Sequence, residues 1–338
     1  MKTTKRILSI FLALVLGLML IVPAAADSPC DLPEGITVKM VRKPYIIGPQ
    51  YIGGIREGSF VIMRDGEVVY ESHARGHGMD VPQSMWSVTK SIVSALTGIA
   101  IREGFIESVD QKVIDFYPEA KIDKGQESKR DMTIEHLLTM TSGLPGALDR
   151  GEMNCLMADD AGLAAFESKQ AAAPGERFSY SSGAGPQALV GLLQRVIGRN
   201  LDDFAQEHLF GPLGMDSVTW STAKDGSPTG GMGISMSPRD MLRFGQFYLQ
   251  NGVWKGQQIL PEGWVEQSKP FLKTRLSDYG YLLWGGDHGE LGRFIGARGL
   301  GGQIISAYPE TGLVVVRTGN PSLLMRTVGL LRRILPIF

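Results

Sequence analysis

The stretch Ser84-Met85-Trp86-Ser87-Val88-Thr89-Lys90-Ser91 decides how the rest of this 338-residue chain is interpreted. A serine that attacks a carbonyl carbon needs a base, and Lys90 follows Ser87 by three residues. On a helix this spacing puts both side chains on one face. Apolar residues recur at helical spacing after Ser87, so we predict a helix that begins there. In its first turn, free backbone N–H groups and the helix dipole would favour a developing negative charge.

The same Ser-x-x-Lys spacing occurs again at Ser221-Thr222-Ala223-Lys224. This second copy runs directly into Asp225-Gly226-Ser227-Pro228, a run of residues that favours a turn. We therefore predict a surface loop there. A short motif is specific only when its surroundings agree, so the rest of the chain has to support Ser87 and Lys90.

The charge balance argues against nucleic acid as a partner, and two missing motifs argue against α/β-hydrolases and the commonest zinc hydrolases. Charged residues make up 20% of the chain and the formal net charge is -1, so no basic excess exists to neutralise nucleic-acid phosphates. Neither the Gly-x-Ser-x-Gly turn of α/β-hydrolases nor the His-Glu-x-x-His zinc motif occurs. His73 and His77 lie in a glycine-containing stretch that indicates a loop, without a fuller ligand set. We predict neither a metal nor a cofactor.

The first residues have the pattern of a secretory signal peptide. Basic residues precede an apolar run from Ile7 to Val22, and Pro23-Ala24-Ala25-Ala26 supplies a small-residue cleavage site. Sixteen residues are fewer than the ~20 that a membrane-spanning helix requires. We therefore expect cleavage near Ala26 and a secreted or periplasmic protein with no membrane contact afterwards. Cys30 and Cys155 would both remain and could form a disulfide there, although their spacing leaves the pairing open.

Strand patterns lie toward both ends of the remaining chain and helical patterns lie between them. Residues 59–64 and 67–72 flank Asp65-Gly66 and predict a β-hairpin. Strand patterns return at 279–284, 302–308 and 313–318. We predict an α/β (α+β) fold, in which an antiparallel sheet is flanked by helices and carries an inserted all-helical lobe. The boundaries are a signal peptide at 1–26 and a hydrolase domain at 27–338, with an α/β lobe at about 36–100 and 279–338, a helical lobe at about 101–278, and the site between the lobes.

Four motifs in order resemble those of the β-lactamase-related serine hydrolases. They are Ser87-Val88-Thr89-Lys90, the segment Met132 to Leu144, Phe178-Ser179-Tyr180-Ser181-Ser182, and Gly299-Leu300-Gly301-Gly302-Gln303. That group includes class C β-lactamases, D-alanyl-D-alanine carboxypeptidases, family VIII esterases and 6-aminohexanoate-dimer hydrolase, and the glycine-rich motif is most similar to the last. The resemblance covers nearly all of the chain after the signal peptide and implies a β-lactamase/transpeptidase-like fold.

The resemblance also implies roles for individual residues. Ser87 would be acylated, Lys90 would assist its deprotonation if burial lowers the pKa of the amine, and Tyr180 would be the general base or proton shuttle. The backbone N–H groups of Ser87 and Gly302 would form the oxyanion hole. Substrate contacts would come from the remaining motif positions, namely Ser182, Gly299, Leu300, Gly301 and Gln303.

Two departures from the family pattern bear on the substrate. Ser182 stands where the family often has an asparagine, and a hydroxyl has fewer donors than an amide. Gly299-Leu300-Gly301 stands where β-lactamases carry a Lys-Thr-Gly motif whose cation pairs with the carboxylate of the drug. Arg298 is adjacent, but alternation along a strand points its side chain to the opposite face.

We therefore expect a secreted serine hydrolase that cleaves small neutral or cationic esters or amides and turns over β-lactams poorly. One alternative is a D-alanyl-D-alanine carboxypeptidase or a β-lactamase that acts on cell-wall peptides or β-lactams. A second is an inactive penicillin-binding-like protein that only binds a ligand. The sequence leaves the exact substrate and the oligomeric state open.

Overall fold

The computed structural model describes residues 58–145, 154–180, 183–269, 271–274 and 277–319, all within the compact unit Lys39–Phe338. Its helices are α3 (Val88–Arg102), α4 (Ile134–Leu138), α6 (Ala161–Glu167), α7 (Ala184–Ile197), α8 (Leu201–Ala205), α9 (Gly211–Leu213), α10 (Pro238–Leu249) and α11 (Trp264–Ser268). Shorter 3₁₀ turns are η1 (Val113–Phe116), η2 (Glu127–Asp131) and η4 (Gly289–Leu291), and η3 (Gln206–Phe210) is a π-helical turn.

The strands are β1 (Ser59–Arg64), β2 (Glu67–His73), β3 (Gln83–Ser84), β4 (Thr219–Trp220), β5 (Ile234–Met236), β6 (Val253–Trp254), β7 (Gln257–Gln258), β8 (Leu272–Lys273), β9 (Asp278–Tyr279), β10 (Trp284–Asp287), β11 (Arg293–Gly299), β12 (Gln303–Tyr308) and β13 (Leu313–Arg317). The predicted signal peptide, Cys30 and Ser182 lie outside the described residues, so the cleavage site and the disulfide stay predictions.

One antiparallel sheet of eight described strands has the order β2-β1-β13-β12-β11-β10-β9-β8. Its first hairpin is the predicted one, because Asp65 and Gly66 adopt φ angles of 51° and 85° and so form the left-handed turn that matches strand twist. β1 then pairs with β13 from the far end of the described chain. The sheet therefore joins residues before the Ser87 helix to residues more than 200 positions later, as the predicted mixed fold requires.

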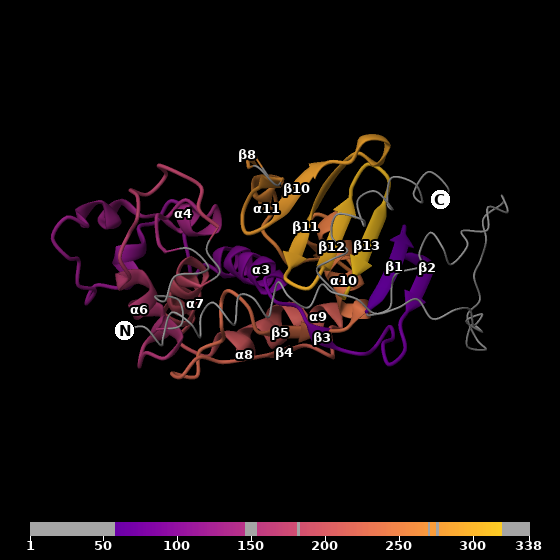
Figure 1. Cartoon of the computed structure of the whole chain (residues 1–338), viewed down its shortest axis with the longest axis horizontal. Coiled ribbons are helices and arrows are strands. Elements are labelled where there is room, and N and C mark those ends of the chain that lie inside the picture. Colours follow the sequence, from indigo (N-terminus) through magenta and orange to yellow (C-terminus); the bar gives the residue numbers. More distant parts are fainter. Residues whose placement is uncertain (1–57, 146–153, 181–182, 270, 275–276, 320–338) are drawn as a thin grey trace, which may run out of the picture. The chain divides into compact units, whose positions relative to one another are not determined.

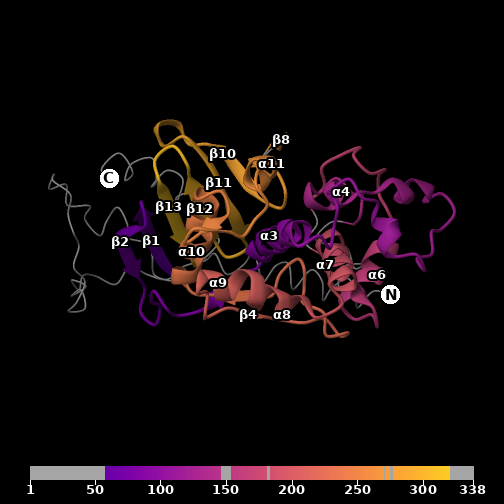
Figure 2. The ribbon, with the colours of Figure 1, turned by 180° about the vertical axis from the view of Figure 1, so that it is seen from behind.

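Helix α10 covers one face of the sheet and contacts β12 and β13 (Figure 2). Ser237 caps the helix by accepting the Asp240 N–H, and Pro238 follows at the first helical position. At Gly245 the helix lies close to the sheet, because an added Cβ would overlap Val314 and lie 3.2 Å from Ile305. The absence of a side chain at this glycine lets α10 lie directly on the sheet.

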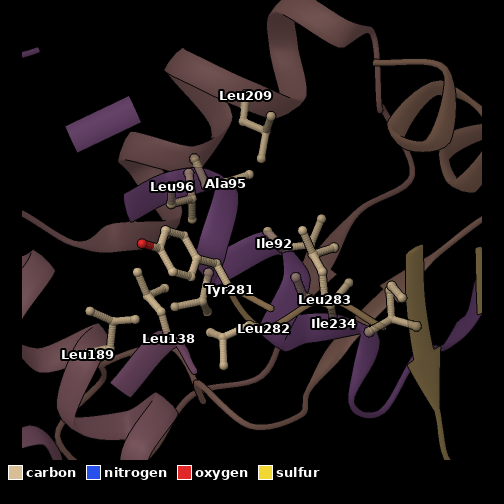
Figure 3. Packing of buried hydrophobic residues seen from close by; sticks show 14 of the residues in the cluster. Ile92, Ala95, Leu96, Leu138, Leu189, Leu209, Ile234, Tyr281, Leu282 and Leu283 are labelled. Carbon is tan, nitrogen blue, oxygen red and sulfur yellow. The ribbon is translucent and has the colours of Figure 1, made fainter. Parts of the chain in front are cut away.

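Helix α3 is the centre of the hydrophobic core. Every residue from Val88 to Ala100 is buried, and the helix contacts α7 as well as β11 (Figure 1). Figure 3 shows side chains of α3 packed among Leu138, Leu189 and the segment Tyr281 to Leu283. Each fully buried aliphatic side chain of this kind stabilises the fold by about 1.5–3 kcal/mol, so the position of Ser87 at the start of α3 is strongly fixed.

The short helix α4 begins with a reciprocal cap between Thr133 and His136. The Thr133 hydroxyl accepts the His136 N–H, and the His136 ring accepts the Thr133 N–H in return. This reciprocal arrangement satisfies two backbone donors that a helix start would otherwise leave without partners.

The prediction of one continuous strand over residues 279–284 is wrong. It forms the separate short strands β9 and β10, and Leu282 between them has a φ of 54°. The Leu282 N–H donates to the Leu138 carbonyl at 2.7 Å, and the Ser91 hydroxyl donates to the Leu282 carbonyl at 2.8 Å. These long-range hydrogen bonds override the local strand preference. Segment 101–278 also contains short strands, β4 to β8, that the sequence pattern did not indicate.

None of the helices in the described ranges combines the length with the apolar character that crossing a bilayer requires.

Gly98 and Gly185 offer a matched test of helix packing. An added Cβ at Gly98 would lie 2.7 Å from the Trp264 ring, whereas at Gly185 the nearest atom is 3.9 Å away. Gly98→Ala should lower the free energy of unfolding, because overpacking costs about 1–3 kcal/mol and exceeds the gain in helix propensity of about 0.5–1 kcal/mol. Gly185→Ala should raise it by about the propensity gain. Urea denaturation measures both, and equal effects would contradict the packing described here.

Candidate active site

Ser87 lies at the N-terminal end of α3, in the position that normally caps a helix. Its side chain makes no capping hydrogen bond. Instead the hydroxyl oxygen accepts a hydrogen bond from Lys90 Nζ at 2.9 Å. The predicted three-residue spacing on one helix face is therefore confirmed, and it brings a hydroxyl and an amine into direct contact.

Lys90 is 1% exposed, and its Nζ also donates to the Gly231 carbonyl at 2.6 Å. Two hydrogen bonds hold the amine in one place, which matters because a lysine otherwise has a long and mobile stem. The Nζ lies 5.2 Å from the centre of the Tyr180 ring. The structure thus brings Ser87, Lys90 and Tyr180 into one cluster, although they come from distant parts of the sequence.

The backbone immediately before Ser87 is held in an unusual conformation. Trp86 has a φ of 50°, a left-handed conformation that costs an ordinary residue about 1–2 kcal/mol. The Thr89 hydroxyl donates to the Trp86 carbonyl at 2.7 Å and accepts the Ile234 N–H at 3.1 Å. Met85 N–H donates to the Ile234 carbonyl at 2.8 Å. These bonds to β5 offset the strain and fix the entry into α3.

The start of α3 offers fewer free N–H groups than its sequence predicts. The N–H groups of Val88, Thr89 and Lys90 donate to the carbonyls of Met85, Trp86 and Ser87 at 3.0–3.2 Å. The prediction of several free donors in the first turn is therefore wrong, because a tight turn precedes the helix. Within the described residues the Ser87 N–H has no acceptor, so one donor remains at the helix start.

Tyr180 is packed in a group of aromatic rings. Its ring centre lies 5.9 Å from that of Tyr279 and 5.4 Å from that of Trp284. The Ser179 N–H donates to the Met140 carbonyl at 2.9 Å and holds the segment before Tyr180. Burial, followed by the nearby Tyr180, raises the pKa of Tyr279 well above its usual value. Tyr279 therefore remains neutral at ordinary pH. Tyr180 is half-buried and is the tyrosine that lies beside Lys90.

The Gly299–Gly302 segment forms the tight turn between β11 and β12, with Gly299 paired to Gln303. A Cβ added at Gly299 would overlap the Met85 carbonyl oxygen, and one at Gly301 would lie 3.9 Å from Trp86 Nε1. Glycine is therefore required for the turn to lie beside the residues that precede Ser87. Gly302 has a φ of 81°, which also favours glycine.

The other predicted substrate-contact residues differ in accessibility. Leu300 at the tip of the turn is 62% exposed, whereas Gln303 is 6% exposed at the start of β12. Leu300 is therefore accessible to a ligand and little of Gln303 is, and the substrate contacts of both stay predictions. Ser182 lies outside the described residues, so its role stays a prediction.

Sequence reasoning missed three contributors to the site: Trp86, Trp284 and the Gly231 carbonyl. Trp86 is 40% exposed beside the serine, an unusual exposure for an indole, and Trp284 contacts Tyr180. The left-handed backbone at Trp86 depends on Thr89 and β5, which no local pattern reveals. A backbone carbonyl such as that of Gly231 has no signature beyond the glycines around it.

The second Ser-x-x-Lys copy forms no such cluster. Lys224 donates to Asp159 at 2.9 Å in an exposed ion pair, and Thr222 pairs with Pro228 across a turn. The predicted surface loop is confirmed, and Ser221 and Lys224 provide controls for Ser87 and Lys90.

A hydroxyl held by a buried lysine at a helix start, beside an antiparallel sheet, defines the site of a serine hydrolase. The Beta-lactamase family model matches residues 46–323, so the chain belongs to the β-lactamase family, as its motifs predict.

Known proteins support this assignment. The 6-aminohexanoate-dimer hydrolase of Paenarthrobacter ureafaciens is 24% identical over 233 residues, which are 62% of this chain and 56% of the relative. A Bacillus anthracis protein assigned provisionally to the same activity has a similar structure, with a TM-score of 0.69, 23% identity, and coverage of 85% of this chain and 81% of that one. The β-lactamase/D-alanine carboxypeptidase of Pseudomonas syringae has a TM-score of 0.68 at 15% identity, with coverage of 85% and 97%.

Together these likenesses confirm the predicted β-lactamase/transpeptidase-like fold. The match to the Paenarthrobacter enzyme spans little more than half of that protein's length.

Thr89 can be tested against Thr97, a second buried threonine of α3. Thr89→Val removes the hydrogen bond to Trp86 and leaves the buried Ile234 N–H without a partner, which costs about 1–3 kcal/mol. The Thr97 hydroxyl bonds only to the Val93 carbonyl within the helix. Thr89→Val should therefore lower both the free energy of unfolding and the rate of ester hydrolysis, and Thr97→Val should affect activity far less. Equal losses of activity would show that Thr89 does not position Ser87.

Gly299→Ala tests the contact between the turn and the Met85 carbonyl. The added methyl group must displace the turn, and a shift of about 1 Å near reacting groups can cost about 100-fold in rate. We expect kcat/KM for an activated ester to fall about 10- to 100-fold with retained far-UV circular dichroism. Gly78→Ala is the control, because its Cβ would lie 3.5 Å from the nearest atom. Wild-type activity in Gly299→Ala would place the turn away from the reaction.

Proposed function

We propose that this chain is a secreted or periplasmic hydrolase that cleaves small ester or amide bonds through an acyl-enzyme on Ser87. The observation that carries the proposal is the 2.9 Å hydrogen bond from buried Lys90 to the Ser87 hydroxyl. A serine is a weak nucleophile until a neighbouring group stabilises its deprotonated form, and a lysine held one helical turn away supplies that stabilisation.

The acylation step begins with Tyr180 as a phenolate beside the Lys90 ammonium. The Ser87 oxygen forms a bond to the substrate carbonyl carbon while its proton passes to the phenolate oxygen of Tyr180. The electron pair of the carbonyl moves onto the substrate oxygen. When the tetrahedral intermediate collapses, the bond to the leaving alcohol or amine breaks, and that group takes the proton from Tyr180. The Lys90 Nζ, 5.2 Å from the ring centre, offsets negative charge on either oxygen.

The oxyanion of the intermediate accepts hydrogen bonds from the Ser87 and Gly302 N–H groups. The Ser87 donor has no acceptor within the described residues. The turn that carries Gly302 adjoins Met85 and Trp86, the two residues before Ser87, which supports a shared role of the two amides. In deacylation a water molecule replaces the leaving group, gives its proton to Tyr180 and releases the acid, and Ser87 regains its proton.

Apolar side chains flank the serine. Trp86 and Leu300 are 40% and 62% exposed, and Trp284 lies beside Tyr180. Such rigid apolar surface binds a short aliphatic or aromatic group next to the scissile bond. The similar Paenarthrobacter protein is named for hydrolysis of 6-aminohexanoate dimer, which supports an amide or ester as the substrate class here.

The alternatives rest on weaker support. A carboxypeptidase or β-lactamase shares this fold, but Gly299-Leu300-Gly301 resembles the Lys-Thr-Gly motif of β-lactamases without its lysine, because Gly299 stands at that position. An inactive binding protein would have no need to retain Ser87, Lys90 and Tyr180 together.

The export of the protein rests on the basic and apolar pattern of residues 1–26, and N-terminal sequencing of the mature protein tests cleavage near Ala26. The two-lobe division remains part of the proposal.

Replacement of Ser87 and Lys90 tests the mechanism against the second Ser-x-x-Lys copy. Ser87→Ala should lower kcat for short p-nitrophenyl esters by at least about 1000-fold and abolish labelling by a fluorophosphonate probe, because no nucleophile remains. Lys90→Met should lower kcat by about 100- to 10,000-fold. Ser221→Ala and Lys224→Met should behave as wild type. Labelling that persists in Ser87→Ala would identify a different nucleophile and overturn the proposal.

β-Lactam turnover separates the proposal from its first alternative. We expect slow nitrocefin hydrolysis and weak labelling by fluorescent penicillin, together with efficient cleavage of neutral short-chain esters. Efficient, Ser87-dependent nitrocefin hydrolysis would favour a β-lactamase or carboxypeptidase instead.

A further inference from the structure

His136 joins the start of α4 to the segment that leads into Tyr180. Its Nδ1 accepts the Thr133 N–H at 3.1 Å as part of the cap. Its Nε2, on the other side of the ring, lies 3.2 Å from the position that a Cβ would take at Gly175. Gly175 has a φ of 81°, so both its backbone and the neighbouring ring favour glycine. One imidazole therefore contacts two segments that are far apart in the sequence.

Three backbone hydrogen bonds hold residues 171–179 against the chain that follows α4. They run from the N–H groups of Ala171, Gly175 and Ser179 to the carbonyls of Gly143, Thr141 and Met140, at 2.8, 2.8 and 2.9 Å respectively. The Thr141 N–H donates to the His136 carbonyl at 2.9 Å, which ties the same stretch back to α4. Because Ser179 directly precedes Tyr180, the end of α4 supports the proposed general base.

The cap of α4 requires a neutral imidazole. Nδ1 of His136 can accept a hydrogen bond only while it carries no proton, and protonation puts an N–H on both ring nitrogens. A protonated ring would turn a donor toward the Thr133 N–H, which is itself a donor. The cap would then be lost, and the start of α4 would have one backbone donor without a partner.

The surroundings of the ring favour this neutral form. Burial lowers the pKa of His136, while the Glu135 carboxylate raises it and Lys112 lowers it further. On the facing segment, the Glu176 carboxylate instead accepts the Ala173 N–H at 2.9 Å. As the pH falls, the histidine of the unfolded chain, with a pKa of about 6.5, takes up its proton before that of the folded chain. The contribution of the cap to stability is therefore complete above about pH 6.5 and is lost as the pH falls through the lower, folded-state pKa.

We propose that His136 is a positioning residue for Tyr180 and that it acts only as a neutral imidazole, so that acid releases the Tyr180 segment. This inference rests on the hydrolase function proposed above and deepens it, because it adds a control by pH to the same site. Loss of the cap loosens the end of α4, where Met140 and Thr141 supply acceptors to that segment. Tyr180 then shifts relative to Ser87, and proton transfer slows. The effect falls on kcat rather than on KM.

Two replacements of His136 separate the cap from its titration. A glutamine at this helix position can accept the same backbone N–H but does not titrate. His136→Gln should therefore keep kcat for p-nitrophenyl acetate within about threefold of wild type near pH 7.5, and should exceed wild type about 3- to 10-fold near pH 5. His136→Ala removes the acceptor and should lower kcat about 10- to 100-fold at both pH values, with little change in KM. The ratio of each variant to wild type isolates His136, because titration of the other site residues is common to all.

His208 provides the matched control. Its ring centre lies 4.3 Å from that of Phe204 and its Nε2 lies 3.5 Å from Glu207, and none of these residues belongs to the cap. His208→Gln should show the pH dependence of the wild type. Identical pH profiles for wild type and His136→Gln, or a loss in His136→Ala that appears in KM alone, would overturn the inference.

Hydrogen exchange measures the release of the segment without relying on activity. In the wild type, peptides that cover residues 171–180 should lose protection about 10-fold between about pH 7.5 and pH 5, after correction for intrinsic exchange, whereas peptides of β12 and β13 should keep theirs. His136→Gln should keep protection in all of them.

The two measurements distinguish failure of this inference from failure of the hydrolase proposal. The expected exchange pattern with no hydrolysis by the wild type would retain the pH-dependent support of the Tyr180 segment and reject the hydrolase. Ser87-dependent hydrolysis, with equal protection of residues 171–180 in wild type and His136→Gln at both pH values, would retain the hydrolase and reject the role of His136.

Discussion

The hydrogen bond between the Lys90 amine and the Ser87 hydroxyl is the contact on which the site depends. It forms only because α3 is one regular helix whose first turn is held by Thr89 and β5, and because the Gly231 carbonyl takes a second N–H of the amine. A buried lysine is expensive to desolvate, so the surroundings must supply partners at fixed positions. The core around α3 can therefore be understood as the support of one polar pair.

The sheet contributes the second half of the site at the end of β11. Glycine at position 299 lets this strand end against the Met85 carbonyl. The turn that follows lies beside Trp86, the residue with the left-handed backbone. A direct contact between the helix entry and the sheet thereby positions Ser87 and the turn that carries Gly302, the proposed oxyanion donor. Aromatic rings from β9, β10 and the Tyr180 segment then connect the lysine to the opposite sheet face.

Local signals predicted much of the fold. The Asp65-Gly66 turn and the apolar period after Ser87 each act within a few residues, and both appear in the structure. Long-range effects were not predictable in the same way. The strand 279–284 is interrupted because Leu282 bonds to α3 and α4, and the left-handed conformation of Trp86 depends on β5. The sheet face of Arg298 followed from alternation, but the contact of Trp284 with both Arg298 and Tyr180 arises only when β10 and the Tyr180 segment pack together.

The loop at Leu282 also ties together elements that could otherwise loosen independently. Through one carbonyl and one N–H it is bonded to Ser91 of α3 and to Leu138 at the end of α4, while its neighbours continue into the sheet strand β10. Opening any one of these elements exposes buried polar groups in the other two. This loop therefore couples the three elements and favours their cooperative, all-or-none unfolding. Slow hydrogen exchange of the Leu282 amide would show that coupling.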